Sequence, residues 1–136
     1  MKSAEVVDEI VVVKNKDFDY SSFLEHIKDN VDTKFITILD DLGVGYCKNE
    51  AFKHLLNKNC DHIFLIEDDT VIKNADVFKK YIDTAKAFNI GHLTYGGCSP
   101  FKQWRQPIAR IANKDISIDF YHHVKGEFCY YSANAL

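Results

Sequence analysis

Three consecutive carboxylates, Glu67, Asp68 and Asp69, directly follow a run of four apolar residues at positions 63–66. An apolar run of this length is typical of an interior strand that is covered on both faces. Side chains alternate across an extended strand, so we expect Glu67 and Asp69 on one side and Asp68 on the other. Like charges at this spacing repel one another, and a bound cation would offset the repulsion.

A divalent metal ion is the natural counter-charge for such a cluster. Carboxylate oxygens suit hard cations, and Mg²⁺ or Mn²⁺ also bridges to the phosphate groups of a substrate. In open α/β sheets, ligands bind in the crevice at the carboxyl ends of the strands, which is where these acids fall. The sequence therefore favours a metal site that serves a phosphate-bearing ligand. A solvated acidic turn after a strand is the alternative.

The segments around the acids alternate between strand and helix patterns. Three apolar or β-branched runs predict strands at residues 10–13, 35–39 and 63–66. Three segments with helical spacing predict helices at residues 21–29, 45–57 and from Asn74 or Asp76 to about residue 88. This order favours right-handed crossovers on a largely parallel sheet.

After residue 89 the pattern becomes richer in strands. Residues 91–95 and 126–131 predict two more strands, and residues 108–112 and 116–120 predict a hairpin. We therefore predict an α/β fold of three layers, a Rossmann-like α/β/α arrangement around a mostly parallel sheet, with a β-hairpin region toward the C-terminus.

Polar residues follow each of the three early strands. They are Lys14 and Asn15, then Asp40 and Asp41, then the Glu67 cluster. In a parallel sheet these ends meet at one edge, so we expect one site there.

A Gly-x-Gly turn follows the second strand. Gly43 and Gly45 allow the backbone to approach a ligand closely, and the N-terminus of the next helix favours anions. Lys48 and Asn49 lie within that helix. Two glycines at this spacing are also typical of a plain tight turn, and an early helical lysine is often solvated surface.

Composition limits the classes of function. A chain of 136 residues with 46% hydrophobic residues fits a single domain, residues 1–136, with a substantial core. The net charge of −3 argues against a nucleic-acid partner. We expect no signal peptide and no transmembrane segment, because the first ten residues carry three acids and no apolar run is long enough. The four widely spaced cysteines suggest reduced thiols in the cytoplasm, although two disulfides are arithmetically possible.

Residues 43–52, followed by residues 61–69, resemble the glycosyltransferase-A fold of the large glycosyltransferase family 2. In that family a pattern like N-x-G-x-x-x-A-R-N-x-G begins a helix, and the next strand ends in an Asp-x-Asp metal motif. Here Lys48 and Asn49 stand where Arg-Asn is usual, and the Glu67 cluster stands where Asp-x-Asp is usual. Residues 10–15, 36–41 and 126–132 are also similar to strands of the family, so the resemblance covers most of the chain.

The resemblance implies transfer of a sugar from a nucleotide-diphospho-sugar to a saccharide, lipid or protein acceptor, with Mn²⁺ or Mg²⁺ as the cofactor. Residues 9–95 would form the nucleotide and metal half, and residues 96–136 the acceptor side. Asp69 is implied as the direct metal ligand. Glu67 would contact the ribose or a metal-bound water, and Asp68 would assist. The other implied nucleotide-sugar contacts are Asn15, Asp40, Asp41, Gly45, Lys48 and Asn49.

No general base is identified, because the family's base lies beyond the strand that residues 126–132 resemble. We therefore expect the C-terminal part to be incomplete. Glu127 and Asp119 are possible substitutes, although each is also typical of a surface acid. His122 and His123 would point to opposite faces of a strand, so both would rarely bind one ion. His92 is expected to be structural.

Two other classes of function stay open. One is a non-catalytic or truncated domain that binds a nucleotide-sugar and transfers nothing. The other is a Mg²⁺-binding receiver of the response-regulator type, because residues 65–69 also resemble its acidic pocket. That pocket follows the first strand of a receiver, whereas here the acids follow two strand-helix units.

Overall fold

The computed structural model describes residues 7–14, 19, 21–30, 33–40, 42–67, 70–74, 76–95, 107–121, 126 and 128–136. The chain divides into two compact units. Unit 1 comprises Met1–Ile63 with Leu136, and unit 2 comprises Phe64–Ala135. The division falls inside the strand β3 (His62–Ile66).

Unit 1 is built on a parallel pair of strands. β1 (Val7–Lys14) and β2 (Thr33–Asp40) run side by side in parallel, and their last residues, Lys14 and Asp40, are partners in the register. The two carboxyl ends therefore lie at the same edge of this pair.

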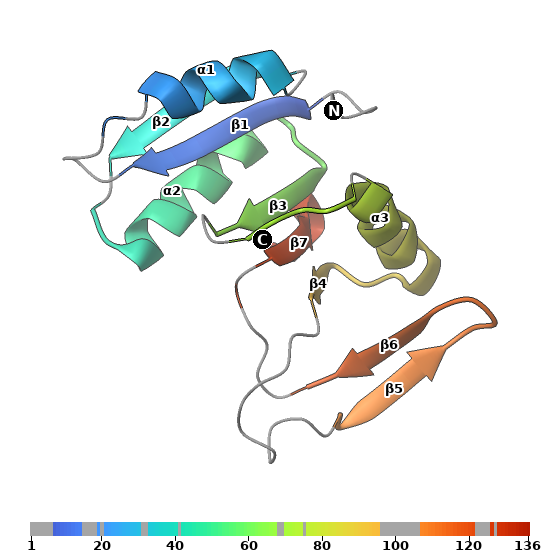
Figure 1. Ribbon diagram of the computed structural model, residues 1–136. Coiled ribbons are helices and arrows are strands. Elements are labelled where there is room, and N and C mark those ends of the chain that lie inside the picture. Colours follow the sequence, from blue (N-terminus) through green and yellow to red (C-terminus); the bar gives the residue numbers. More distant parts are fainter. Residues whose placement is uncertain are drawn as a thin grey trace. The chain divides into compact units, whose positions relative to one another are not determined.

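Two helices complete unit 1. α1 (Ser21–Asn30) lies between the two strands in sequence, and the Asp19 carboxylate accepts a hydrogen bond from the Ser21 backbone N–H (3.0 Å). α2 (Val44–Asn57) follows β2 after a short loop and packs against both β1 and β2 (Figure 1). The helix thus covers the strand pair and begins close to its carboxyl edge.

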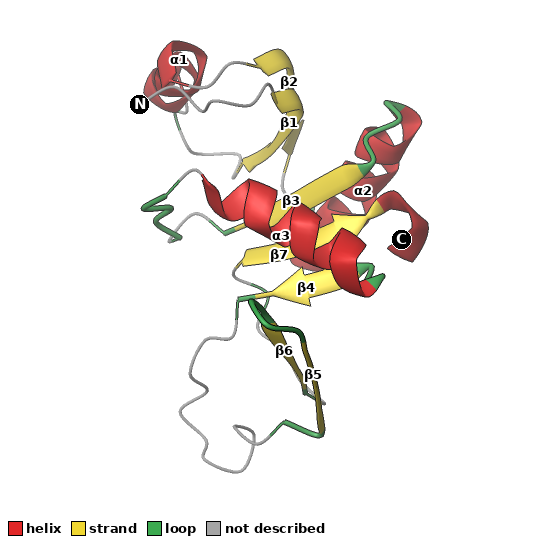
Figure 2. Ribbon diagram, turned by 90° about the vertical axis from the view of Figure 1, so that its right-hand side faces the viewer, coloured by secondary structure: helices red, strands yellow, loops and turns green. Residues whose placement is uncertain are grey.

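Unit 2 contains most of β3, a helix and two further strands in one small sheet. The strand order is β3-β7-β4, where β7 is Phe128–Ser132 and β4 is His92–Thr94, and β4 pairs with β7 in the antiparallel direction (Figure 2). α3 (Asp76–Phe88) precedes β4 and contacts it. A 3₁₀ turn, η2 (Ala133–Ala135), follows β7.

The core of unit 2 is aromatic. The rings of Phe64 and Phe78 meet edge to face with centroids 4.9 Å apart, and Tyr81 meets Phe128 in the same way at 5.2 Å. Tyr130 also lies against Phe64, at 5.2 Å, and is almost fully buried. Such contacts add about 0.5–1.5 kcal/mol per pair beyond the area they bury, so this cluster is a main source of stability for the sheet and α3.

The C-terminal residues pack against Gly91, which directly precedes β4. Gly91 accepts a hydrogen bond at its carbonyl oxygen from the Ser132 backbone N–H (2.8 Å). A Cβ atom placed on Gly91 would lie 2.7 Å from the Ala135 Cβ, which is closer than side chains approach. This contact requires glycine at position 91.

A separate hairpin completes the described strands. β5 (Ala109–Ala112) and β6 (Ser117–Phe120) are antiparallel, with Arg110 opposite Asp119. Asn113 forms the turn, because its side-chain oxygen accepts from the backbone N–H groups of Asp115 and Ile116. The hairpin predicted for residues 108–120 is confirmed.

The predicted fold class is wrong. The described strands form three small sheets with two, three and two strands, rather than one mostly parallel three-layer sheet. The parallel β1-β2 pairing and the antiparallel β5-β6 hairpin follow the expectation, whereas β4 pairs with β7 in the antiparallel direction and lies in a separate sheet. The physical reason is that local periodicity identifies strands, while the choice of partner depends on contacts between distant segments. Among the described residues, β3 is hydrogen-bonded to β7, a strand from the far end of the sequence.

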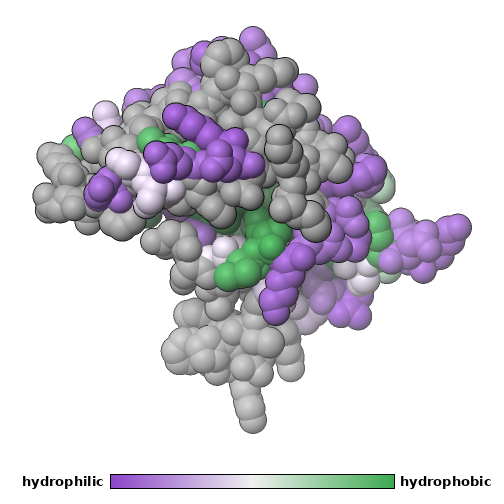
Figure 3. All heavy atoms as spheres, turned by 45° about the horizontal axis from the view of Figure 1, so that its top comes forward, coloured by the Kyte–Doolittle hydropathy of each residue, from purple (hydrophilic) through white to green (hydrophobic). Residues whose placement is uncertain are grey.

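On the face shown in Figure 3, hydrophilic side chains cover much of the described surface, and hydrophobic residues show in small areas between them. Among the described residues, none of the helices combines the length and the apolar character that crossing a membrane requires.

Candidate functional site

The predicted nucleotide contacts that the structure describes are concentrated in unit 1, where β2 ends and α2 begins. Asp40 is the last residue of β2 and is exposed. Gly45, Lys48 and Asn49 lie in the first turns of α2. Residues three and four apart share one face of a helix, so these three residues lie on the same side of α2. The structure therefore brings part of the predicted set to one edge of unit 1.

Cys47 fixes the loop that joins β2 to α2. Its buried sulfur accepts a hydrogen bond from the Leu42 backbone N–H (3.2 Å) and donates to the Asp40 carbonyl oxygen (3.5 Å). Its own backbone N–H donates to the Gly43 carbonyl oxygen (3.0 Å), which closes the first helical turn. From the sequence, Cys47 was expected only to be a reduced thiol. The signal for its role was a small, apolar residue at the inward position of a first helical turn.

Glycines leave the start of α2 open. Gly43 is the N-cap residue and has a φ of 109°, a conformation that favours glycine. A Cβ atom at Gly43 or Gly45 would meet no heavy atom of the described residues within 4 Å. The first N–H groups of a helix have no partners within the helix and carry its positive dipole end. This edge can thus receive an anionic group without obstruction from the two glycines.

Glu67 lies in unit 2, where it is exposed directly after β3. Carboxylate oxygens are the ligands that Mg²⁺ and Mn²⁺ prefer, so the Glu67 side chain is of the type that binds a hard divalent cation. The described residues contain no group of three or more His, Cys, Asp or Glu side chains able to hold a metal ion. The other predicted metal ligand, Asp69, falls outside those residues.

Several predicted residues lie outside the described part of the chain. From the nucleotide and metal set they are Asn15, Asp41, Asp68 and Asp69. From the acceptor side they are His122, His123 and Glu127.

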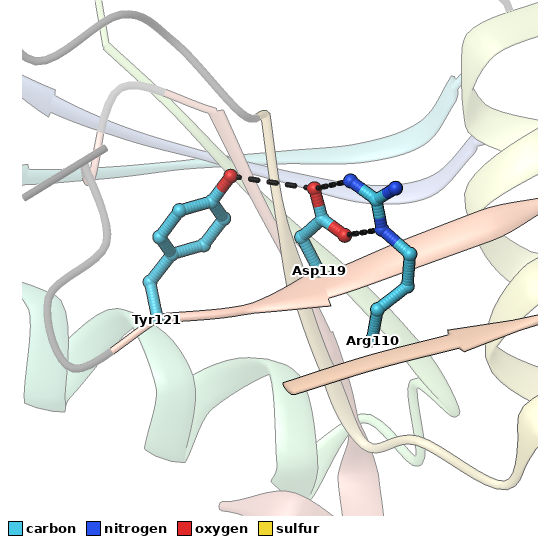
Figure 4. A network of polar contacts seen from close by, with 3 residues as sticks. All are labelled: Arg110, Asp119 and Tyr121. Atoms are coloured by element: carbon cyan, nitrogen blue, oxygen red, sulfur yellow. Dashed lines mark hydrogen bonds and ion pairs between the residues drawn. The ribbon is translucent and has the colours of Figure 1, made fainter. Parts of the chain in front are cut away.

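Asp119, a candidate general base, is held in a polar network on the β5-β6 hairpin. Its carboxylate accepts hydrogen bonds from the Arg110 Nε and from Arg110 Nη2 (2.9 Å), and the Tyr121 hydroxyl donates to it at 3.4 Å (Figure 4). The hydrogen bond from Arg110 lowers the pKa of Asp119, and the same contact raises the pKa of Arg110. A carboxylate with a lowered pKa is a weaker base, so this environment suits a structural link across the hairpin better than proton abstraction.

His92 stacks on a tyrosine in unit 2. The rings of His92 and Tyr131 are nearly parallel, with an angle of 7° and centroids 4.5 Å apart. Desolvation lowers the pKa of His92, and it raises the pKa of Tyr131 to about 12. Both rings are thus favoured in their neutral forms, which agrees with the structural role expected for His92.

A buried polar pair at the opposite end of β1 was not predicted from the sequence. The Glu9 side chain is 2% exposed, and its Oε1 lies 2.9 Å from Nε2 of His54 near the end of α2. Burial, followed by the charges of Asp8, Glu9 and Asp61, raises the pKa of the nearby Cys60 thiol. The sequence around Glu9 did not indicate that its side chain is buried, because an acid just before an apolar run normally marks the solvated start of a strand.

Comparison of the chain with models of protein families, with curated proteins and with solved structures finds no match in any of the three. The functional assignment consequently depends on the residues themselves.

Proposed function

We propose that this chain binds a nucleotide-diphospho-sugar with the help of Mn²⁺ or Mg²⁺ and transfers the sugar to a saccharide, lipid or protein acceptor. The observation that carries the proposal is the edge of unit 1, where the exposed Asp40 and a glycine loop fixed by Cys47 lead into an open helix start. The order of residues from Gly43 to Asp69, which resembles family 2 glycosyltransferases, supports the same function.

The start of α2 would hold the diphosphate of the donor. Backbone N–H groups at a helix N-terminus bind anions, and Lys48 on the same face as Gly45 adds a positive charge. Asp40, at the end of β2, would accept hydrogen bonds from the base or ribose. Asn15, Asp41 and Asn49 are proposed as further contacts of the nucleotide-sugar.

Glu67 and Asp69 would hold the metal ion, with Asp68 in support. When bound, the metal would neutralise the charge that develops on the diphosphate leaving group. The residues of the chain itself would bind the donor, orient the diphosphate and restrict its motion. Such positioning and charge stabilisation lower the barrier to transfer.

We place this function in the cytoplasm. The support is that Cys47, Cys60 and Cys129 are thiols rather than disulfides, as expected in a reducing compartment.

The test is thermal unfolding of the whole chain with UDP, GDP, CDP and their sugars, each with and without Mn²⁺. A ligand at about 100 times its Kd adds about 2.7 kcal/mol to the stability of the folded state. We expect one nucleotide class to stabilise the protein only with Mn²⁺, and we expect Asp69→Ala to remove the effect. The matched control is Asp61→Ala, which removes an exposed acid just before β3 and should keep the response.

The outcomes separate the three classes of function. Metal-dependent binding with release of the nucleoside diphosphate from the donor supports the transferase. Metal-dependent binding without any turnover supports a non-catalytic nucleotide-sugar-binding domain. Stabilisation by beryllium fluoride and Mg²⁺, with no response to nucleotides, would support a receiver and refute the proposal.

A further inference from the structure

A large aromatic side chain is exposed at the start of α2. Tyr46 lies in the first turn of the helix and is 55% exposed, and its neighbours Leu42 and Val44 are also exposed. Tyrosine normally buries much of its ring, and clustered apolar surface left in water on a folded domain often marks a binding site.

The backbone that carries Tyr46 is fixed. The buried Cys47 sulfur is hydrogen-bonded to the backbone at Leu42 and at Asp40, and the Cys47 N–H is bonded to Gly43. A tyrosine on such a backbone has only two side-chain torsions to order when a ligand binds. It therefore offers a large contact area at a low cost in conformational entropy.

The ring is suitably placed for a ligand that also contacts the helix start. Side chains on a helix lean toward its N-terminus, so a residue in the first turn lies over the end that carries the open N–H groups. Gly43 and Gly45, on either side of Val44, add no side chain there. A diphosphate at the helix start would leave the rest of a nucleotide within reach of an aromatic face.

We propose that Tyr46 is the surface on which the nucleobase of the donor stacks, an inference that rests on the proposed function. Stacking is available to every base, because each has a π-face. Tyr46 thus supplies affinity for the nucleoside part of the ligand, and the exposed Leu42 and Val44 extend the apolar contact. The choice among bases is left to hydrogen-bonding groups such as Asp40.

The experiment compares a ligand that has a base with one that lacks it. Titration calorimetry with Mn²⁺ measures binding of UDP, GDP, CDP and inorganic pyrophosphate to the wild type, Tyr46→Ala and Tyr46→Phe. We expect Tyr46→Ala to weaken the best nucleoside diphosphate by about 5- to 100-fold and to leave pyrophosphate unchanged. Tyr46→Phe, which keeps the ring, should bind like the wild type.

Tyr95→Ala is the matched control, because Tyr95 is exposed to a similar degree (65%) and is not among the residues proposed to contact the ligand. It should not change either affinity. Equal losses for the nucleotide and for pyrophosphate in Tyr46→Ala, or no loss for either, would overturn the stacking role and leave the proposed function standing. A wild type that binds none of the four ligands would overturn the proposed function as well.

Discussion

The pair formed by Glu9 and His54 allows a quantitative prediction about unit 1. It joins β1 to α2, with a carboxylate that is 2% exposed and an imidazole that is 28% exposed, 2.9 Å apart. Removing one partner of a buried hydrogen bond costs about 1–3 kcal/mol, because the group left behind has lost water without keeping its partner. The partial exposure of His54 admits water, so we expect the cost of His54→Ala to stay within about 1–3 kcal/mol.

Two further variants separate charge from packing. Glu9→Gln keeps the shape and a hydrogen-bonding group, so we expect a smaller cost of about 1 kcal/mol. The double variant Glu9→Leu with His54→Leu replaces both groups with apolar side chains. It should lie within about 1 kcal/mol of the wild type, since replacing both partners of a buried hydrogen bond with apolar groups of similar shape is often nearly neutral.

The assay is urea denaturation followed by far-UV circular dichroism, with the single and double variants arranged as a double-mutant cycle. Glu50→Ala serves as the control. It also removes an acid of α2, but Glu50 pairs with Lys53 on the solvated surface of the helix. It should change the stability by less than about 0.5 kcal/mol. If His54→Ala costs no more than this control, or if the single variants add without coupling, the pair does not hold α2 against β1.

Three more predictions follow from unit 2 and from the end of α2. Gly91→Ala should lower the free energy of unfolding by about 1–3 kcal/mol in urea denaturation, because its Cβ would clash with Ala135, whereas Gly45→Ala, in an open helical position, should be neutral or stabilising. Folding lowers the pKa of His92 below its ordinary 6.5, so the unfolded chain takes up more protons as the pH falls below 6.5. Stability should be lost in that window, and His92→Gln should reduce the slope of unfolding free energy against pH; an unchanged slope would refute the role of His92. Burial raises the pKa of Cys60, so its alkylation at about pH 8, measured by mass spectrometry of the peptides, should be slower in the folded than in the unfolded chain, and equal rates would contradict this.

The positions of the elements were largely predictable from the sequence. Residues 45–57 were expected to be helical and α2 is Val44–Asn57, and the helix expected after Asn74 is α3. The side-chain oxygen of Asn74 accepts from the Asp76 backbone N–H (2.9 Å), as expected of a residue at a helix start. Hydrophobic spacing and capping residues act locally, and they are therefore visible without the fold.

The ends of α2 and α3 are also determined by the local sequence. Each is followed by an asparagine with a positive φ, Asn59 at 58° and Asn89 at 53°. Asparagine tolerates this left-handed conformation better than most residues, and it ends a helix by redirecting the chain. Both asparagines could be identified in the sequence as helix stops.

The sheet could not be predicted in the same way. The alternation of strand and helix suggested one parallel sheet, and only β1 with β2 follows that rule among the described strands. The apolar residues of β3 fit an interior strand, but nothing in that run specifies β7 as its partner. The partner is chosen by packing such as the contact of Phe64 with Phe128 and Tyr130, which joins segments far apart in sequence.

The candidate site was likewise predictable only where its features are local in sequence. The Gly43–Gly45 turn and Lys48 were visible because they are adjacent in sequence and share one helix face. The Glu9–His54 pair was not visible, since it depends on a contact between residues 45 apart in sequence, whereas the hydrogen bonds of Cys47 are local to the loop between β2 and α2.

The most direct test of the account is a calorimetric titration of the whole chain with nucleotide-diphospho-sugars in Mn²⁺ and again in EDTA. We predict saturable binding of one donor class in Mn²⁺ and at least about a tenfold loss of affinity in EDTA, which corresponds to about 1.4 kcal/mol. Binding of equal strength in both buffers would contradict the role of the metal, and no binding of any donor would contradict the proposed function.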